Sequence, residues 1–250
     1  CPIGINLFFE LEEADYETLL SFDPEDMDPI SLLFQTGYLT IKEKKNVFVK
    51  DEDGKDRADE IYLMAPPNRE VRRSLGKYIL LSYTDKTQMN KIINKQSIFI
   101  NALDNPSGEV FAAAVKGVID EVPSCIHNDN EAYYHSVLLS AMAAMGLKVR
   151  AEVSGGLGRA DIVWDYVKRT VIIELKHLKS NGEKTPPSQI ESEKIEINKK
   201  LDSLAEQALR QIKNKEYHAA YKNKSGIKII LVGAAVDGKY TMARSKVEII

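Results

Sequence analysis

One stretch decides the fold, residues 155–176, which read GGLGRADIVWDYVKRTVIIELK. Residues 161–166 have the alternation and the β-rich composition of a strand, and residues 170–175 form a second run that is rich in β-branched side chains. A short turn over residues 166–169 can join the two runs. The stretch therefore predicts an antiparallel hairpin in which Asp165 faces Thr170.

The register of this hairpin brings charged side chains together. A turn at residues 166–169 places Asp161 opposite Glu174, and cross-strand partners lie about 5 Å apart at Cβ. Lys176 lies on the same side of its strand as Glu174, because side chains two residues apart share a face. Two carboxylates and an ammonium are therefore expected on one patch. Such a patch suits a divalent cation with an activated water beside it.

The sequence around the hairpin predicts an α/β sandwich. A helix is expected over residues 131–145, followed by a strand at 149–153 and then the hairpin. A second helix over 201–221 leads to a buried strand at 227–232, and Asp237-Gly238 predicts a tight turn into a last short strand. Helices would thus flank a mixed central sheet.

The residues before this sandwich predict a separate domain. We place the boundary in a loop of turn residues, so that residues 1–124 form one domain and residues 125–250 the other. A helix beginning at Pro29 and short strands with a charged tip at residues 51–57 are typical of a small helical module of the winged or lid-like type. We expect this module to be a scaffold rather than a binding site of its own.

Composition limits the class of protein. The chain has 250 residues, 44% of them hydrophobic, which is enough for one large or two small globular domains. The formal net charge is -3, so an anionic partner would need a local basic patch. Cys1 and Cys125 are too few for a disulfide framework, which favours a reducing compartment, and we expect a cytoplasmic protein. No apolar run approaches the ~20 residues of a membrane span.

Two further segments bear on function. Residues 180–192 are polar, contain Pro186-Pro187, and predict a loop. No GxxxxGK[ST] phosphate loop occurs in the sequence, so ATP binding of that type is not expected.

The charged patch and its flanking helices resemble the PD-(D/E)XK nuclease superfamily. The residues that carry the resemblance are Glu131 in a helix, Gly158-Arg159-Ala160-Asp161, Glu174-Leu175-Lys176, and Gln211 in a later helix. Ala160 stands where the name of the superfamily has proline. The resemblance implies a restriction-endonuclease-like fold, in which helices flank a mixed sheet. It also implies hydrolysis of nucleic acid with Mg²⁺ as the cofactor, and Mn²⁺ as an alternative ion.

The same resemblance implies a role for each residue. Asp161, Glu174 and the backbone carbonyl of Leu175 would ligate the metal, because Mg²⁺ prefers hard oxygen donors. Lys176 would orient the attacking water or stabilise charge in the transition state. Glu131 is the helical acidic residue of the superfamily and would assist metal binding. The substrate-facing residues would be Gln211, Tyr217 and Arg159.

Two segments of the first domain narrow the resemblance. Residues 33–41, LFQTGYLTI, and residues 67–72, PNREVR, look like the segments that join the ATPase part to the nuclease-like part in a family of bacterial AAA-ATPase-like proteins. This resemblance implies an ATPase portion of the parent chain as a partner. A first residue of cysteine rather than methionine agrees with a piece of a longer chain.

Each of the strand residues also has a structural interpretation. Asp161 could be a solvated residue at the start of a strand, but glycines before it allow a close backbone approach to a ligand. Glu174 and Lys176 could be the wet face of a strand, but they follow a run expected to be buried on both faces, where charge is costly. Function is favoured at these three positions.

The helical candidates are more evenly balanced. Glu131 lies in a first helical turn, where the helix dipole alone favours an acid. His135 is more often structural at such a place, and Gln211 could be plain helix surface. Arg159 could hold a phosphate or pair with an acid. Basic residues concentrate near the later helix, which suits either a solvated face or a phosphate backbone: Lys199, Lys200, Arg210, Lys213, Lys215, Lys222 and Lys224.

Two classes of function follow. The first is metal-dependent hydrolysis of nucleic-acid phosphodiester bonds, with DNA expected as the substrate. The second is a catalytically silent module of nuclease fold that recruits nucleic acid or protein to an AAA-type ATPase. The complete set of Asp161, Glu174 and Lys176 favours the enzyme, because a structural role does not require all three.

Overall fold

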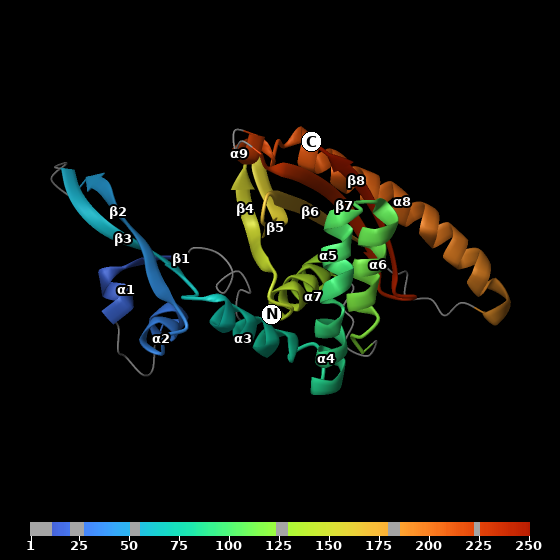
Figure 1. The fold of residues 1–250 in the computed structure, drawn as a ribbon, viewed down its shortest axis with the longest axis horizontal. Coiled ribbons are helices and arrows are strands. Elements are labelled where there is room, and N and C mark those ends of the chain that lie inside the picture. Colours follow the sequence, from blue (N-terminus) through green and yellow to red (C-terminus); the bar gives the residue numbers. More distant parts are fainter. Residues whose placement is uncertain (1–11, 21–27, 51–55, 124–129, 180–185, 223–225) are drawn as a thin grey trace. The chain divides into compact units, whose positions relative to one another are not determined.

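The computed structural model describes residues 12–20, 28–50, 56–123, 130–179, 186–222 and 226–250 (Figure 1). Their contacts divide the chain into two compact units, residues 1–72 and residues 73–250. Within the described ranges, no helix is both long and apolar enough to cross a membrane. Cys1 and Cys125, on which the expected compartment rests, lie outside these ranges.

The described part of unit 1 is a small antiparallel sheet with two short helices. Its three strands have the order β1-β3-β2. The second helix begins at Pro29, as predicted, and the Asp28 side chain caps it by accepting a hydrogen bond from the Ile30 amide. The core contains Ala14, Leu19, Leu39 and Met64. The elements are β1 (Glu12–Asp15), α1 (Tyr16–Leu20), α2 (Pro29–Gln35), β2 (Thr40–Lys50) and β3 (Asp56–Ala65).

Unit 2 is built on a five-stranded mixed sheet. Its strands have the order β4-β5-β6-β7-β8, and all neighbours are antiparallel except the central pair β6 and β7. The long helix α8 lies between these two in the chain, because a parallel pair needs a crossover connection. The strands are β4 (Lys148–Gly155), β5 (Gly158–Tyr166), β6 (Arg169–Leu178), β7 (Lys228–Asp237) and β8 (Met242–Ile249).

Helices cover both faces of this sheet. Val163 and Ile172, which pair across β5 and β6, pack in a cluster with Leu209 of α8. Trp164, the next residue of β5, points to the other face, where its ring meets Phe99 of α5 edge-on. The helices of unit 2 are α4 (Lys86–Asn94), α5 (Gln96–Asp104), α6 (Gly108–Ile119), α7 (Glu131–Ala144), α8 (Ile190–Asn214) and α9 (Ala219–Lys222), with a 3₁₀ turn η3 (Pro187–Gln189). Helix α3 (Arg69–Leu80) spans the division between the two units.

This architecture confirms the predicted fold class, a restriction-endonuclease-like mixed sheet flanked by helices. The helix predicted over 201–221 was wrong at both ends, because α8 begins at Ile190 and ends at Asn214. A turn follows α8, in which Glu216 has a positive φ of 51°. The predicted loop 180–192 therefore ends earlier, and its residues 180–185 lie outside the described part of the chain.

The two compact units divide the chain at a different place from the predicted domains. The predicted boundary lies between residues 124 and 125, and both of these residues are outside the described ranges. Helices α4, α5 and α6 precede it, yet they belong to unit 2, because α4 packs against α7 and α6 packs against β8. Helices α5 and α6 thus form part of the layer that covers the sheet, and α4 packs against helices of that layer.

Close packing of α8 on β7 depends on Gly233. A Cβ at this position would overlap the carbonyl oxygen of Ala205 and the amide nitrogen of Leu209, and would lie 2.9 Å from the Leu209 Cβ. Gly233→Ala is therefore expected to destabilise the protein by about 2 kcal/mol, measured by chemical denaturation, because an overpacked interface must shift. Gly117→Ala in α6 is the matched control, since its Cβ meets only the flexible Lys95 side chain within 4 Å. An equal loss in both variants would contradict this account.

Candidate active site

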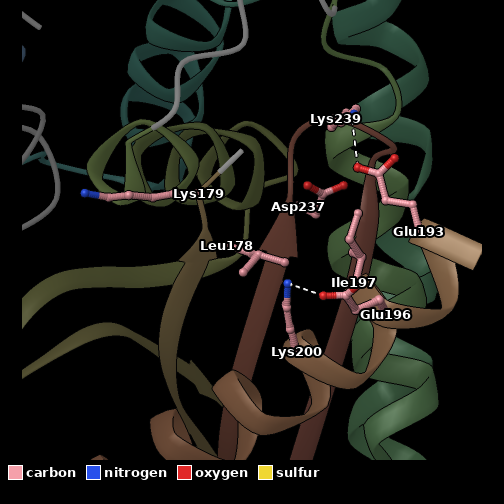
Figure 2. A pocket seen from close by; sticks show the side chains of 8 residues that line it. All are labelled: Leu178, Lys179, Glu193, Glu196, Ile197, Lys200, Asp237 and Lys239. Atoms are coloured by element: carbon pink, nitrogen blue, oxygen red, sulfur yellow. Dashed lines mark hydrogen bonds and ion pairs between the residues drawn. The ribbon is translucent and has the colours of Figure 1, made fainter. Parts of the chain in front are cut away.

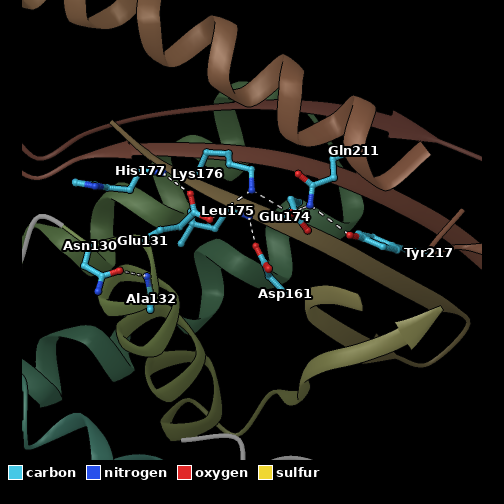
Figure 3. A network of polar contacts seen from close by, with 10 residues as sticks. All are labelled: Asn130, Glu131, Ala132, Asp161, Glu174, Leu175, Lys176, His177, Gln211 and Tyr217. Carbon is cyan, nitrogen blue, oxygen red and sulfur yellow. Dashed lines mark hydrogen bonds and ion pairs between the residues drawn. The ribbon is translucent and has the colours of Figure 1, made fainter. Parts of the chain in front are cut away.

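The hairpin of β5 and β6 has the predicted register. Ile162 pairs with Ile173, and Asp165 pairs with Thr170. Asp161 and Glu174 are the next residues of the two strands, on the face that α8 covers. One carboxylate oxygen of Asp161, Oδ2, accepts a hydrogen bond of 2.7 Å from the Leu175 amide (Figure 3). Strand pairing therefore brings the two carboxylates together.

Glu174 is a buried carboxylate with one oxygen unpaired. Glu174 is 1% exposed. Oε1 accepts hydrogen bonds from Lys176 Nζ at 3.2 Å and from Gln211 Nε2, whereas Oε2 is buried without a hydrogen-bond partner. Burial, and then the negative charge of Asp161, raise the pKa of Glu174 to about 7. The site thus holds more negative charge than its own residues neutralise.

Asp161 is held in place from both strands and from a helix. Burial raises the pKa of its carboxyl, although the hydrogen bond from the Leu175 amide works in the opposite direction. The ring of His135, on α7, lies with Nε2 2.8 Å from the backbone oxygen of Asp161. Because a carbonyl oxygen only accepts, Nε2 must carry the hydrogen. His135 therefore fixes the backbone of β5 at the site.

Lys176 is the cation of the network. Its Nζ lies 3.2 Å from Glu174 Oε1 and 3.4 Å from Glu131 Oε1. Burial lowers the pKa of Lys176, but the charges of Glu174 and Glu131 outweigh burial and raise it overall. Lys176 is therefore protonated at neutral pH and cannot act as a general base there.

Glu131 joins the network from the first turn of α7. The helix begins with Asn130 as its N-cap, whose side chain accepts a hydrogen bond from the Ala132 amide at 3.0 Å. Glu131 Oε2 also accepts from the His177 amide at 3.3 Å. Glu131 is exposed, so its carboxylate contacts Lys176 from the solvent side of the site.

The predicted substrate-facing residues lie in different surroundings. Gln211 contacts Glu174, and its Nε2 lies 3.3 Å from the Tyr217 hydroxyl. Tyr217 is 2% exposed, so it supports Gln211 from within the core. The Arg159 side chain is exposed, two residues before Asp161 on β5, and the described contacts of the network do not include it. The structure thus brings together Gln211 and Tyr217 but leaves Arg159 outside the network.

The donors of the site fit a hard divalent cation. Such a cation would bind the unpaired oxygen of Glu174. It would also reduce the repulsion between the two buried carboxylates. Among the described residues, no group of three or more His, Cys, Asp and Glu is placed to hold a metal ion by itself. A bound ion would therefore need backbone oxygen, such as that of Leu175, and water beside the two carboxylates.

A hollow lies at the end of β6, with a volume of about 140 Å³ (Figure 2). Two of its three lysines are paired, because Lys200 lies 2.6 Å from Glu196 and Lys239 lies 2.8 Å from Glu193, and the Asp237 carboxylate offsets the charge of the third, Lys179. This pairing leaves little net attraction for a phosphate. The hollow is lined by Leu178, Lys179, Glu193, Glu196, Ile197, Lys200, Asp237 and Lys239.

Comparison with known proteins agrees with this geometry. Residues 129–246 match a family model described as "PD-(D/E)XK nuclease superfamily", and this range contains the whole network from Asn130 to Tyr217. The match supports a nuclease-type function in general terms, and nucleases of this superfamily generally use divalent metals.

A longer relative extends the likeness beyond the nuclease-like part. Over 210 residues the chain is 28% identical to the "Uncharacterized protein in vnfD 5'region" of Azotobacter chroococcum mcd 1. The matched segment covers 82% of this chain and 34% of the relative. The chain thus spans about a third of the length of that curated relative. No solved structure matches the chain significantly.

The contact of His135 with Asp161 is testable. His135→Ala removes the hydrogen bond to the Asp161 carbonyl and is expected to lower kcat for nuclease activity about tenfold with little change in KM, because Asp161 loses its position. His135→Gln, whose amide can donate the same bond, is expected to recover most of the rate. The kinetics of the two variants check this role. Equal rates in His135→Ala and the unchanged protein would contradict it.

Proposed function

We propose that unit 2 hydrolyses phosphodiester bonds of DNA with Mg²⁺. The single observation that carries the proposal is the buried Glu174, with one unpaired oxygen, beside Asp161 and 3.2 Å from a protonated lysine. A structural ion pair would satisfy both carboxylate oxygens. A carboxylate left unsatisfied in the core is costly and is expected at a site that gains a cation.

Asp161, Glu174 and the carbonyl of Leu175 would hold the ion. When bound, Mg²⁺ would act as a Lewis acid on a phosphate oxygen and make a nearby water more acidic. Gln211 donates a hydrogen bond to Oε1 of Glu174, which leaves the buried Oε2 atom free of hydrogen bonds and available to a cation. His135 and the Leu175 amide hold Asp161 from its backbone and its carboxylate.

Lys176 stabilises charge on the reacting phosphate. In hydrolysis the water oxygen forms a bond to phosphorus and the bond from phosphorus to one ester oxygen breaks; one water proton is lost to solvent and the leaving oxygen gains one. Negative charge grows on the phosphate oxygens during this exchange. Lys176 remains protonated and can donate hydrogen bonds to them. Glu131 orients the ammonium from the exposed side.

A substrate panel tests the proposal. Purified protein is incubated with labelled single-stranded DNA, double-stranded DNA and RNA, with Mg²⁺, with Mn²⁺ and with a chelator. The expected result is metal-dependent cleavage of DNA that exceeds cleavage of RNA. Binding of DNA without any cleavage would instead support the silent recruiting module and would overturn the enzyme.

Three expectations from the sequence stay predictions. The family match begins at residue 129 and does not bear on the ATPase portion expected from residues 33–41 and 67–72. The individual roles of the site residues and the cytoplasmic location likewise await experiment. An ATPase portion that activates the nuclease would show itself as faster DNA cleavage when the longer parent chain is compared with this one.

A further inference from the structure

An exposed leucine stands at the tip of the hairpin between β4 and β5. The tip reads Gly155-Gly156-Leu157-Gly158, and Leu157 is 80% exposed. A single exposed leucine is ordinary on a protein surface. The position of Leu157 and the way its backbone is held distinguish it from other exposed apolar residues.

The tip is clamped against the turn that follows α8. The Leu157 amide donates a hydrogen bond of 2.8 Å to the carbonyl oxygen of Lys215. Gly156 has a φ of +52°, and a Cβ there would overlap the Lys215 oxygen and lie 2.6 Å from the Glu216 oxygen. Only glycine fits at this place. The clamp presents the Leu157 side chain to solvent from a fixed backbone.

The same tip adjoins the candidate active site. A Cβ on Gly158 would lie 3.0 Å from the Tyr217 ring and 3.3 Å from its hydroxyl, which contacts Gln211 and through it Glu174. Asp161 follows Leu157 by four residues of strand, a separation of about 13 Å along β5. A nucleic acid with a phosphate at the carboxylates would therefore reach the tip within a few nucleotides.

Cations flank the leucine. Arg159 and Lys215 are both exposed, and neither makes an ion pair among the described contacts. Glu216 is exposed beside them and offsets part of this charge. An apolar tip with cations at its base suits a polyanion that has an apolar interior, which is the character of stacked bases within a phosphate backbone.

We propose that Leu157 inserts between stacked bases of duplex DNA bound at the candidate active site, while Arg159 and Lys215 contact the adjacent phosphates. The inference rests on the proposed function, since it takes DNA as the ligand of unit 2. Apolar side chains such as leucine unstack a base step when they enter a groove as a wedge. Insertion would bend or open the duplex near the bond to be cut and so select deformable steps.

The test uses duplex DNA with 2-aminopurine placed at successive positions, because the fluorescence of this base rises when it is unstacked. Two proteins are compared, and both carry Lys176→Ala to prevent cleavage. One keeps Leu157 and the other carries Leu157→Ala. We expect a rise at one or two adjacent positions, lost in Leu157→Ala, together with about tenfold weaker binding. Leu157→Met is expected to retain the rise.

Val167→Ala is the matched control. Val167 is 89% exposed, has a φ of 50°, and stands at the hairpin tip at the other end of β5. Its replacement is expected to leave fluorescence and affinity unchanged. The inference is overturned by binding without a rise, by an equal rise in Leu157→Ala, or by no DNA binding at all. A fluorescence rise that depends on Leu157, together with no DNA cleavage by the protein with Lys176 intact, would refute the proposed hydrolysis. The insertion of Leu157 between bases would still hold in that case.

Discussion

Replacing Lys176 with alanine is expected to lower kcat for DNA cleavage about 10²–10³-fold. Its ammonium lies 3.2 Å from Oε1 of the buried Glu174, and its raised pKa keeps it charged. Charge that develops on the reacting phosphate would then lose its donor. Because substrate binding draws on other cations as well, KM is expected to change much less. Steady-state cleavage of a labelled duplex measures both constants.

Lys116→Ala supplies the control for this loss. Lys116 lies on α6 and pairs with Asp120, one turn away on the exposed side of the same helix. Lys116→Ala removes one positive charge from unit 2, as Lys176→Ala does, but leaves the site unchanged. The cleavage rate is therefore expected to stay within about twofold of the unchanged protein, because an exposed ion pair of this kind contributes little. Similar rates for Lys176→Ala and Lys116→Ala would mean that the cleavage does not arise at this site.

The second large effect is a loss of stability as pH rises. The Glu174 carboxyl has a pKa of about 7 in the folded protein and 4.5 in its ordinary state. Between these values the folded protein keeps a proton that the unfolded chain has lost. The folded state therefore has its full stability from this group below pH 4.5, and it loses that contribution as pH rises toward 7. Chemical denaturation without metal should show a free energy of unfolding that is lower at pH 8 than at pH 5 by roughly 2–3 kcal/mol.

Magnesium should reverse this loss. A cation between the two carboxylates stabilises their ionised forms, so at pH 8 added Mg²⁺ is expected to restore most of the free energy of unfolding. Glu174→Gln removes the titrating group, and both the pH dependence and the response to Mg²⁺ should shrink together. Stability that rises from pH 5 to pH 8, or an equal Mg²⁺ response in the variant, would contradict the account.

The site was predictable where it depends on strand pairing. A short turn after Tyr166 determines the register of the hairpin, and register alone places Asp161 beside Glu174. Lys176 follows from the two-residue period of the strand. The residues that face each other across β5 and β6 are therefore local consequences of one contiguous stretch.

Contacts between distant segments were harder to predict. His135 lies one turn after Glu131 on α7, which is a signal for a shared face, but its bond to the Asp161 carbonyl depends on how α7 packs on the sheet. Tyr217 was expected to face substrate; it lies within the turn at residues 215–218, is buried, and contacts Gln211 through its hydroxyl. The turn after α8 depends on tertiary contacts with the Gly156 hairpin tip rather than on local propensity.

The place of the helices over residues 86–119 also depends on contacts between distant segments. The helices over residues 86–119 are amphipathic, and their apolar faces do not say which sheet they will cover. Phe99 of α5 packs on Trp164 of β5, a pair separated by more than sixty residues. Such long-range packing places α5 with the sheet that follows it.

The most direct test of the central claim compares the unchanged protein with Asp161→Asn on circular and on end-labelled DNA, with Mg²⁺ and with a chelator. We expect cleavage by the unchanged protein only when Mg²⁺ is present, and a rate at least about 10²-fold lower for Asp161→Asn. Equal cleavage by the two proteins would contradict the claim, and so would DNA binding by the unchanged protein without cleavage in Mg²⁺.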